Sequence, residues 1–191
     1  METSQTVTAI MDAAQELVQT RGYNAFSYRD LAERVGIRTA SIHYHFPAKS
    51  DLGGALVRRY AAAVGEARDR IEHEVQDAPT RLRRYAALLE SVLRDGSRIC
   101  LGGMMASDFA TLPEPVQHEV TQFIADNERW LAGVMEQGRR EGTLAFAGEA
   151  ATAAGAFFGA LEGAMFVARG CDDLERYRRS AEWLVEMLIA R

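Results

Sequence analysis

Apolar residues recur at helical spacing through most of the chain, and few segments alternate as a strand would. In the first such stretch the apolar positions are Ile10, Ala13, Ala14, Leu17 and Val18. A spacing of three or four residues is typical of the buried face of a helix. No long alternating run of β-branched residues appears, so the pattern predicts an all-α protein.

A short helix is predicted to begin at Ser27. Its hydroxyl can cap the free amides, and Asp30 stands in the reciprocal capping position, near the positive end of the helix. Gly36 follows the apolar face and suits a left-handed turn, because it has no Cβ. The apolar face of this helix consists of Leu31, Ala32 and Val35.

A second short helix is predicted from Arg38 or Thr39, and Pro47 limits its length. Ile42 and Phe46 would form its inward face. The residues left outside are Thr39, Ala40, Ser41, His43 and His45. Small residues at the N-terminal end of a helix can approach base edges closely, so the layout is typical of a helix-turn-helix that reads DNA.

The stretch AAQELVQTRGYNAFSYRDLAERVGIRTASIHYHFPAKSDL resembles the TetR family of bacterial transcriptional regulators. The resemblance extends over about residues 7–60. It implies a homodimer of nine-helix, all-α subunits, each with an N-terminal DNA-binding domain governed by a larger domain that holds a small ligand. From spacing alone, the alternative is a helical hairpin in an unrelated all-α protein.

We expect a DNA-binding helix-turn-helix domain over residues 1–48 and a ligand-binding and dimerisation domain over 49–191. The residues expected to contact DNA are Arg29, Arg38, Thr39, Ala40, Ser41, His43, Tyr44 and Lys49. Thr39 to Ser41 and His43 are expected near base edges. Arg29, Tyr44 and Lys49 are expected on phosphates, where they would position the helix without specifying sequence.

The charge distribution allows only a modest general attraction to DNA. The net charge is −5, with +1 on residues 1–60 and −6 on the remainder. Affinity must therefore come from a few placed contacts, doubled by a dimer.

Breakers divide the remainder into further helices. Pro79, Gly96, Pro113, Pro115 and Gly142 are the main ones. They predict helices over about 49–75, 80–94 (opened by Thr80), 100–110, 113–141, 148–169 and 172–190.

One of these helices carries glycine at every fourth position, at Gly155, Gly159 and Gly163. Each glycine in a helix interior costs about 1 kcal/mol relative to alanine, so the stripe indicates a close approach by another helix. In the TetR family the last two helices of each subunit form a four-helix dimer interface. The resemblance therefore implies an interface with these glycines, Trp183 and Met187. The alternative is close packing within one subunit.

Large, soft side chains on the central helices are the candidates for a ligand pocket. They are Cys100, Met104, Met105, Phe109, Phe123, Trp130 and Phe158, with Met135 and Met165 of the same kind. Ordinary core packing is the alternative for each, because methionine and aromatic residues fill irregular cores equally well.

Cys100 begins the stretch CLGGMMASDFATLPEPV, which resembles a TetR branch with members that respond to reactive electrophiles. A helix N-terminus favours a thiolate, and Arg98 would help. The alternative is a small buried apolar residue. A small ligand, largely apolar or electrophilic, is expected.

Other kinds of chemistry find little support. Cys100 and Cys171 do not make a disulfide framework, and Glu114 and His118 lack a third metal ligand. No phosphate loop is found, and we expect no catalytic site, cofactor or metal. The apolar residues 150–168 contain Glu162 and are a poor membrane span, and residues 1–15 lack the apolar core of a secretory signal. A cytoplasmic protein is expected.

Two functions remain open. The first is a DNA-binding repressor that a small molecule releases from a palindromic operator. The second is a helical small-molecule binder or enzyme that keeps the fold without reading DNA. Tyr44 and Lys49 at the family's positions favour the first.

Overall fold

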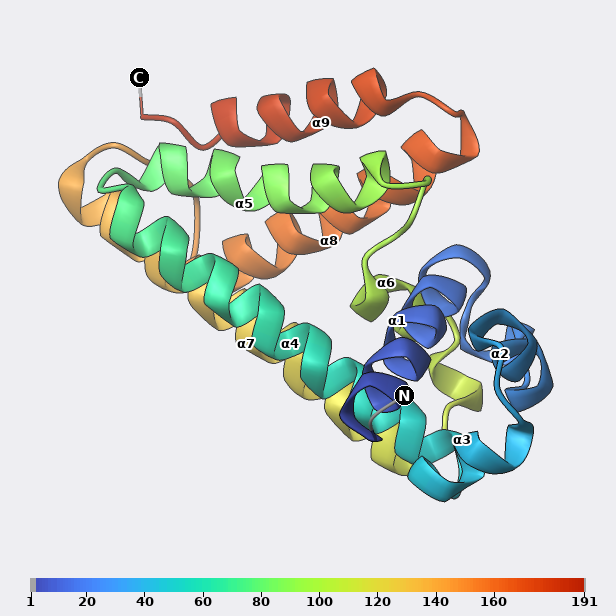
Figure 1. Ribbon diagram of the computed structural model, residues 1–191. Helices are drawn as coiled ribbons and strands as arrows, with labels where there is room; N and C mark the ends of the chain where they lie inside the picture. Colours follow the sequence, from blue (N-terminus) through green and yellow to red (C-terminus); the bar gives the residue numbers. More distant parts are fainter. Residues whose placement is uncertain (1–2, 191) are drawn as a thin grey trace. The chain divides into compact units, whose positions relative to one another are not determined.

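A computed structural model describes residues 3–190. Over these residues the chain forms α-helices and two short 3-10 helices, and no named strand. The first part comprises α1 (Thr3–Arg21), η1 (Tyr23–Ala25), α2 (Tyr28–Val35), α3 (Thr39–His45), α4 (Lys49–Glu74) and α5 (Ala78–Arg94). The second part comprises α6 (Leu101–Ser107), η2 (Phe109–Thr111), α7 (Glu114–Glu141), α8 (Ala150–Gly170) and α9 (Leu174–Glu186). The all-α prediction is confirmed (Figure 1).

The chain forms two compact units. The first unit consists of the described residues up to Ala62 together with Leu101–Phe123. The second unit consists of Ala63–Cys100 and the described residues from Ile124 onward. The expected functional boundary after residue 48 does not coincide with this division, because the start of α4, all of α6 and the start of α7 belong to the first unit.

The helix-turn-helix forms from local sequence signals. The Ser27 amide donates to the Asp30 carboxylate at 2.7 Å, and the Asp30 amide donates to the Ser27 hydroxyl at 3.3 Å. These hydrogen bonds from Ser27 hold the pKa of Asp30 below its ordinary value. Gly36 ends α2 with φ 74°. The capping box and the left-handed turn were both predicted, and both are confirmed.

The bounds of α3 also follow the sequence. Arg38 is the residue before the helix, and α3 ends at His45, before Pro47. Ile42 is fully buried and Phe46 is 8% exposed. The Tyr28 hydroxyl donates to the Phe46 and Ala48 carbonyls at 3.0 and 2.7 Å, so α2 holds the chain that leaves α3.

Two helix boundaries differ from the prediction because of side chains close by. α5 begins at Ala78, since the Asp77 carboxylate rather than Thr80 caps it, accepting from the Thr80 amide at 2.8 Å. The predicted helix over 100–110 is divided into α6 and η2. Between them, the Asp108 carboxylate accepts a hydrogen bond from the Tyr23 amide at 2.8 Å.

The last predicted helix is too long, because α9 ends at Glu186. The residues after it pair with the chain between α7 and α8. The Ala145 amide donates to the Leu188 carbonyl at 2.8 Å, and the Ala190 amide donates to the Thr143 carbonyl at 3.1 Å. An antiparallel bridge joins Leu144 and Ile189.

In the second unit, α9 packs on α5 and α8 (Figure 1). Tyr177 of α9 is 1% exposed, and its hydroxyl donates to the Ala86 carbonyl of α5 at 2.8 Å. Among the described helices, α8 alone is long and apolar enough to cross a membrane, by length and composition only. Among its side chains, Phe157, Phe158 and Leu161 are buried.

Candidate nucleic-acid interface

α3 presents the predicted face to solvent. Ala40, His43 and Tyr44 are exposed, and Thr39 and Ser41 are half-buried. Tyr44 is 80% exposed, which is unusual for so large a ring and indicates a surface prepared for a partner.

The ring of His43 is held in a defined orientation. It meets the Tyr28 ring edge-on, with centroids 4.8 Å apart, and its Nδ1 lies 3.2 Å from the Pro47 carbonyl oxygen. A carbonyl only accepts, so this hydrogen bond requires the proton on Nδ1. The neutral ring then presents Nε2 as an acceptor.

The two arginines of the predicted set are both exposed. The side chain of Arg29 is 84% exposed and pairs with Glu33 at 3.1 Å within α2. Exposed pairs of this kind contribute little, so Arg29 can exchange its partner for a phosphate. Arg38 stands at the start of α3 and makes no capping hydrogen bond with its side chain.

The ammonium of Lys49 contacts the segment before α2. It donates to the Tyr23 carbonyl at 2.6 Å and to the Phe26 carbonyl. It also lies over both of those rings, 4.7 and 4.2 Å from their centroids. Burial lowers the pKa of Lys49. This geometry favours a role in fixing the segment before α2, and a direct phosphate contact by Lys49 stays a prediction.

The residues predicted to line a ligand pocket fall into different units. Cys100, Trp130 and Phe158 belong to the second unit, and Met104, Met105, Phe109 and Phe123 to the first. Phe123 packs on Tyr60, with centroids 5.6 Å apart, and against Gly102, where any side chain would collide with its ring. Phe109 is 39% exposed. These surroundings are those of core and surface residues of the first unit.

A largely buried polar cluster in the second unit was identified only in part from the sequence. We call it the Tyr85 cluster; its members are Arg68, Tyr85, Cys100, Asn127, Trp130, Glu162 and Tyr177. The Tyr85 hydroxyl donates to the Asn127 side-chain oxygen at 2.9 Å, and Trp130 stacks on the Tyr85 ring at 5.5 Å. Burial raises the pKa of Tyr85 well above its ordinary value. Cys100 and Trp130 were among the predicted pocket residues, and for the polar members the one signal in the sequence was a glutamate inside the apolar stretch that became α8.

The glycine stripe of α8 is open over most of its length. No atom of another element lies within 4 Å of a Cβ built on Gly159 or Gly163, so packing within this chain accounts for neither glycine. Gly155 differs, because a Cβ there would lie 3.2 Å from a carboxylate oxygen of Glu128.

Next to this stripe lies an open groove of about 540 Å³ between α8 and α9. Large apolar residues are exposed there and nearby: Val167 by 53%, Trp183 by 62% and Met187 by 56%. The residues lining the groove are Ala160, Gly163, Ala164, Val167, Arg176, Arg179, Ser180, Trp183 and Leu184. Exposed apolar area of this kind marks an interaction surface.

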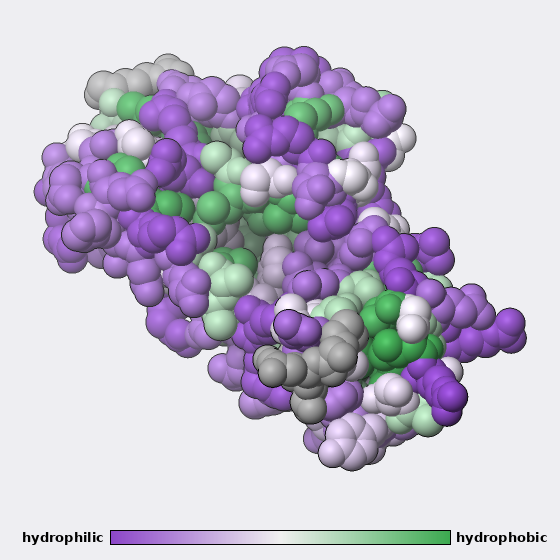
Figure 2. Space-filling model, viewed as in Figure 1, coloured by the Kyte–Doolittle hydropathy of each residue, from purple (hydrophilic) through white to green (hydrophobic). Residues whose placement is uncertain are grey.

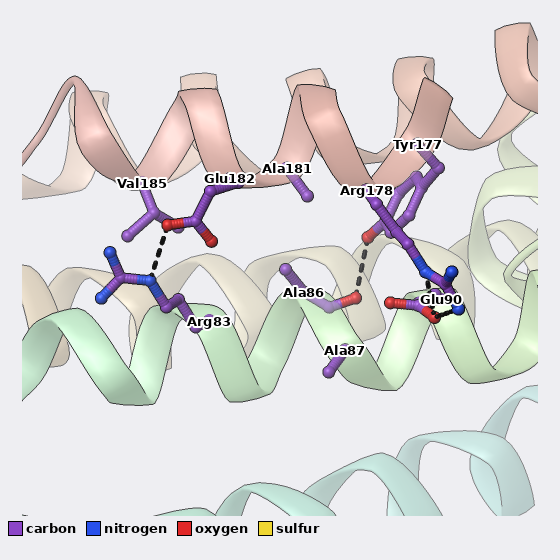
Figure 3. A pocket seen from close by; sticks show the side chains of 9 residues that line it. All are labelled: Arg83, Ala86, Ala87, Glu90, Tyr177, Arg178, Ala181, Glu182 and Val185. Carbon is purple, nitrogen blue, oxygen red and sulfur yellow. Dashed lines mark hydrogen bonds and ion pairs between the residues drawn. The ribbon is translucent and has the colours of Figure 1, made fainter. Parts of the chain in front are cut away.

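A second groove, of about 270 Å³, runs between α5 and α9 and is bordered by charge (Figure 3). Arg83 pairs with Glu182 at 2.9 Å, and Arg178 pairs with Glu90 at 2.7 Å. The charges that border it therefore satisfy one another.

Hydrophilic residues dominate the visible face of the molecule, with smaller apolar areas between them (Figure 2). Over residues 3–190, no three His, Cys, Asp or Glu side chains gather as metal ligands would.

Two family models match the chain. Residues 10–56 match "Bacterial regulatory proteins, tetR family", and residues 78–184 match "Tetracyclin repressor-like, C-terminal domain". No curated protein matches the sequence.

Solved structures of similar fold extend over nearly the whole chain. A TetR-family transcriptional regulator from Agrobacterium tumefaciens is 33% identical, with 99% of this chain and 100% of that chain covered and a TM-score of 0.95. A TetR regulator from Legionella pneumophila is 31% identical over 94% of this chain and 95% of that one, with a TM-score of 0.86. A putative regulator from Saccharomonospora viridis, solved in complex with choline, shares the fold at 23% identity, with 98% and 100% covered and a TM-score of 0.82. The chain belongs to the TetR family of bacterial transcriptional regulators.

Proposed function

We propose that this protein is a cytoplasmic repressor that binds a palindromic operator as a homodimer and is released by a small molecule. TetR-family regulators bind DNA through the helix-turn-helix and carry a ligand-binding C-terminal domain. The observation that carries the proposal is the exposed face of α3, with Ala40, His43 and Tyr44 turned to solvent above a buried Ile42.

Recognition of the DNA base sequence is assigned to the N-terminal part of α3. Thr39, Ala40 and Ser41 are small enough for the helix to lie deep in a major groove. The outward Nε2 of His43 would accept a hydrogen bond from a base amino group, as on adenine or cytosine. Tyr44, Arg29 and Arg38 would contact phosphates on either side.

Dimerisation is assigned to α8 and α9. Gly159 and Gly163 leave room for a second helix, and Trp183 and Met187 supply exposed apolar area. Two copies facing each other through this surface would form a four-helix interface, and the two reading helices would then meet two half-sites.

The effector is assigned to the second unit. In the regulator from Saccharomonospora viridis the same fold was solved with choline, a small organic molecule.

A covalent variant of the proposal uses Cys100 as the contact for an electrophile. Cys100 is 1% exposed, so a reagent would have to enter the bundle to reach it. A Cys100→Ser variant would keep operator binding and lose release by thiol-reactive compounds; equal release of both proteins would remove Cys100 from induction.

A binding assay with the DNA upstream of the protein's own gene tests the central proposal. Ser41→Ala and His43→Ala should change the ranking of base substitutions in the operator, with each lost base contact worth about 1–3 kcal/mol. His118→Ala, an exposed histidine outside the α3 face, is the matched control. Unchanged rankings for both α3 variants would remove the reading face from α3. A protein that binds no DNA while still binding small molecules would support the second function, a binder or enzyme that keeps the fold without reading DNA.

A further inference from the structure

Glu162 of α8 is a buried carboxylate without a counter-charge. Glu162 is 9% exposed, and among residues 3–190 no N–H or O–H group donates a hydrogen bond to either carboxylate oxygen. An unpaired buried charge is costly, and native proteins retain one mainly where function requires it. Its presence therefore calls for an explanation other than folding.

The groups around Glu162 do not supply the missing positive charge. Tyr85 of α5, Tyr177 of α9 and Cys100 are the titratable groups that interact with it. The hydroxyl of Tyr85 donates to Asn127, and that of Tyr177 donates to the Ala86 carbonyl. Burial raises the pKa of Glu162 to about 7, and a hydrogen bond from the Cys100 thiol lowers it by less than burial raises it.

Two hydrogen-bond donors of the same cluster are also unsatisfied. They are Nε1 of Trp130, which stacks on Tyr85, and Nε of Arg68. The guanidinium of Arg68 donates to the Asp126 carbonyl at 2.8 Å and to the Asn127 side-chain oxygen at 3.5 Å. These hydrogen bonds therefore go to a backbone carbonyl and an amide, and neither goes to Glu162. A carboxylate without a cation and two N–H groups without acceptors thus surround one tyrosine.

We propose that the Tyr85 cluster is the effector site and that Glu162 binds the cationic group of a small organic amine or quaternary ammonium ion. The proposal rests on the proposed function and names the ligand class for it. The cation would pair with the carboxylate, and the rings of Tyr85 and Tyr177 would offer faces to which cations are attracted. An acceptor elsewhere on the same molecule would satisfy the N–H groups of Trp130 and Arg68.

The charge state of Glu162 makes binding dependent on pH in a defined direction. With a pKa of about 7, the carboxyl is largely protonated at pH 5.5 and largely ionised at pH 8. A cation binds the ionised form, so its affinity falls about tenfold for each pH unit below 7 and is constant above it. Tyr85 and Tyr177 stay neutral over this range, since burial raises the pKa of each hydroxyl.

Thermal unfolding and calorimetry with a panel of small molecules test the assignment. The panel consists of n-alkylamines and alkyltrimethylammonium ions of two to six carbons, with the matched alcohols and carboxylates. At least one cation should raise Tm above its matched alcohol and carboxylate. Its affinity should fall at least tenfold in Glu162→Gln and about thirtyfold in the parent between pH 8 and pH 5.5. Glu149→Gln, which removes an exposed carboxylate at the start of the same helix, should bind like the parent.

Several results would overturn the proposal. A panel in which no cation binds better than its matched alcohol excludes the ligand class. A cation that binds Glu162→Gln as tightly as the parent excludes the residue. A cation that binds at Glu162 without weakening operator binding excludes the effector role. As a folding control, Glu162→Gln must still melt cooperatively and bind operator DNA without ligand. A failure of the repressor proposal itself would be seen separately, because the parent protein would then not bind the operator.

Discussion

At the scale of single residues, Glu162 couples folding to pH. Burial raises its pKa to about 7 from 4.5. The folded state therefore holds the proton more tightly than the unfolded state. Well below pH 4.5 both states are protonated and no penalty for burying the charge remains; this penalty grows as pH rises toward 7 and is constant above that. Its full size is about 3 kcal/mol, from 1.36 kcal/mol per pKa unit.

Glu162→Gln should remove that penalty. We expect the free energy of unfolding to increase by up to about 3 kcal/mol at pH 8 and to stay unchanged near pH 4.5. Urea unfolding at both pH values measures the difference, with Glu149→Gln as the exposed control. A variant that gains the same amount at both pH values would show that shape, rather than charge, distinguishes the two side chains.

Lys49 and Arg29 make a matched pair of cations with different expected roles. Lys49→Met should lower the free energy of unfolding by about 2 kcal/mol, because the carbonyls of Tyr23 and Phe26 lose a charged donor. The salt dependence of DNA binding by Lys49→Met should match that of the parent. Arg29→Met should leave stability within about 0.5 kcal/mol and flatten the salt slope by about 0.9 per subunit. A flattened slope for Lys49→Met would restore the phosphate contact expected from the sequence.

At the scale of elements, the open face of α8 gives a sharp test of dimerisation. Gly159→Leu meets no atom of another element within the chain, so each subunit should fold normally. A leucine there would stand where two subunits approach, and sedimentation should show a monomer with greatly weakened operator binding. Gly133→Leu on α7, equally exposed and equally open, is the control and should stay dimeric. A dimeric Gly159→Leu would move the interface away from this stripe.

Elements with local signals were predicted well. The capping box of Ser27, the turn at Gly36 and the stop before Pro47 each depend on residues a few positions apart, so they can be found in the sequence. The break between α6 and η2 and the early end of α9 could not be found in the sequence in this way. Both involve partners far along the chain, Tyr23 for Asp108 and Leu144 for Ile189.

The same distinction separates the two candidate sites. The exposed face of α3 follows from helical periodicity over seven residues. The Tyr85 cluster draws its members from α4, α5, α7, α8 and α9 and, with Cys100, from the chain before α6. No spacing in the sequence brings Arg68, Asn127 and Glu162 together. Size and softness found Cys100 and Trp130 of this cluster, but they also favoured methionines and phenylalanines, several of which are core residues of the first unit.

At the scale of the whole molecule, induction requires that the effector bind the DNA-competent and DNA-free states with different affinity. By reciprocity, operator DNA must weaken effector binding by the same factor. Calorimetry with the tightest-binding cation of the panel, on free protein and on protein saturated with operator, measures one factor; operator titrations with and without that cation measure the other. We expect about tenfold in both, and unequal factors would contradict a direct linkage between the two sites.

Lys49 is the only lysine of the chain, and its ammonium is enclosed by two carbonyls and two rings. An amine-directed acylating reagent needs an accessible, neutral nitrogen. It therefore modifies Lys49 mainly while the ammonium is out of contact with these carbonyls and rings. The labelling rate of the peptide that contains Lys49 thus reports how often these contacts open within the first unit.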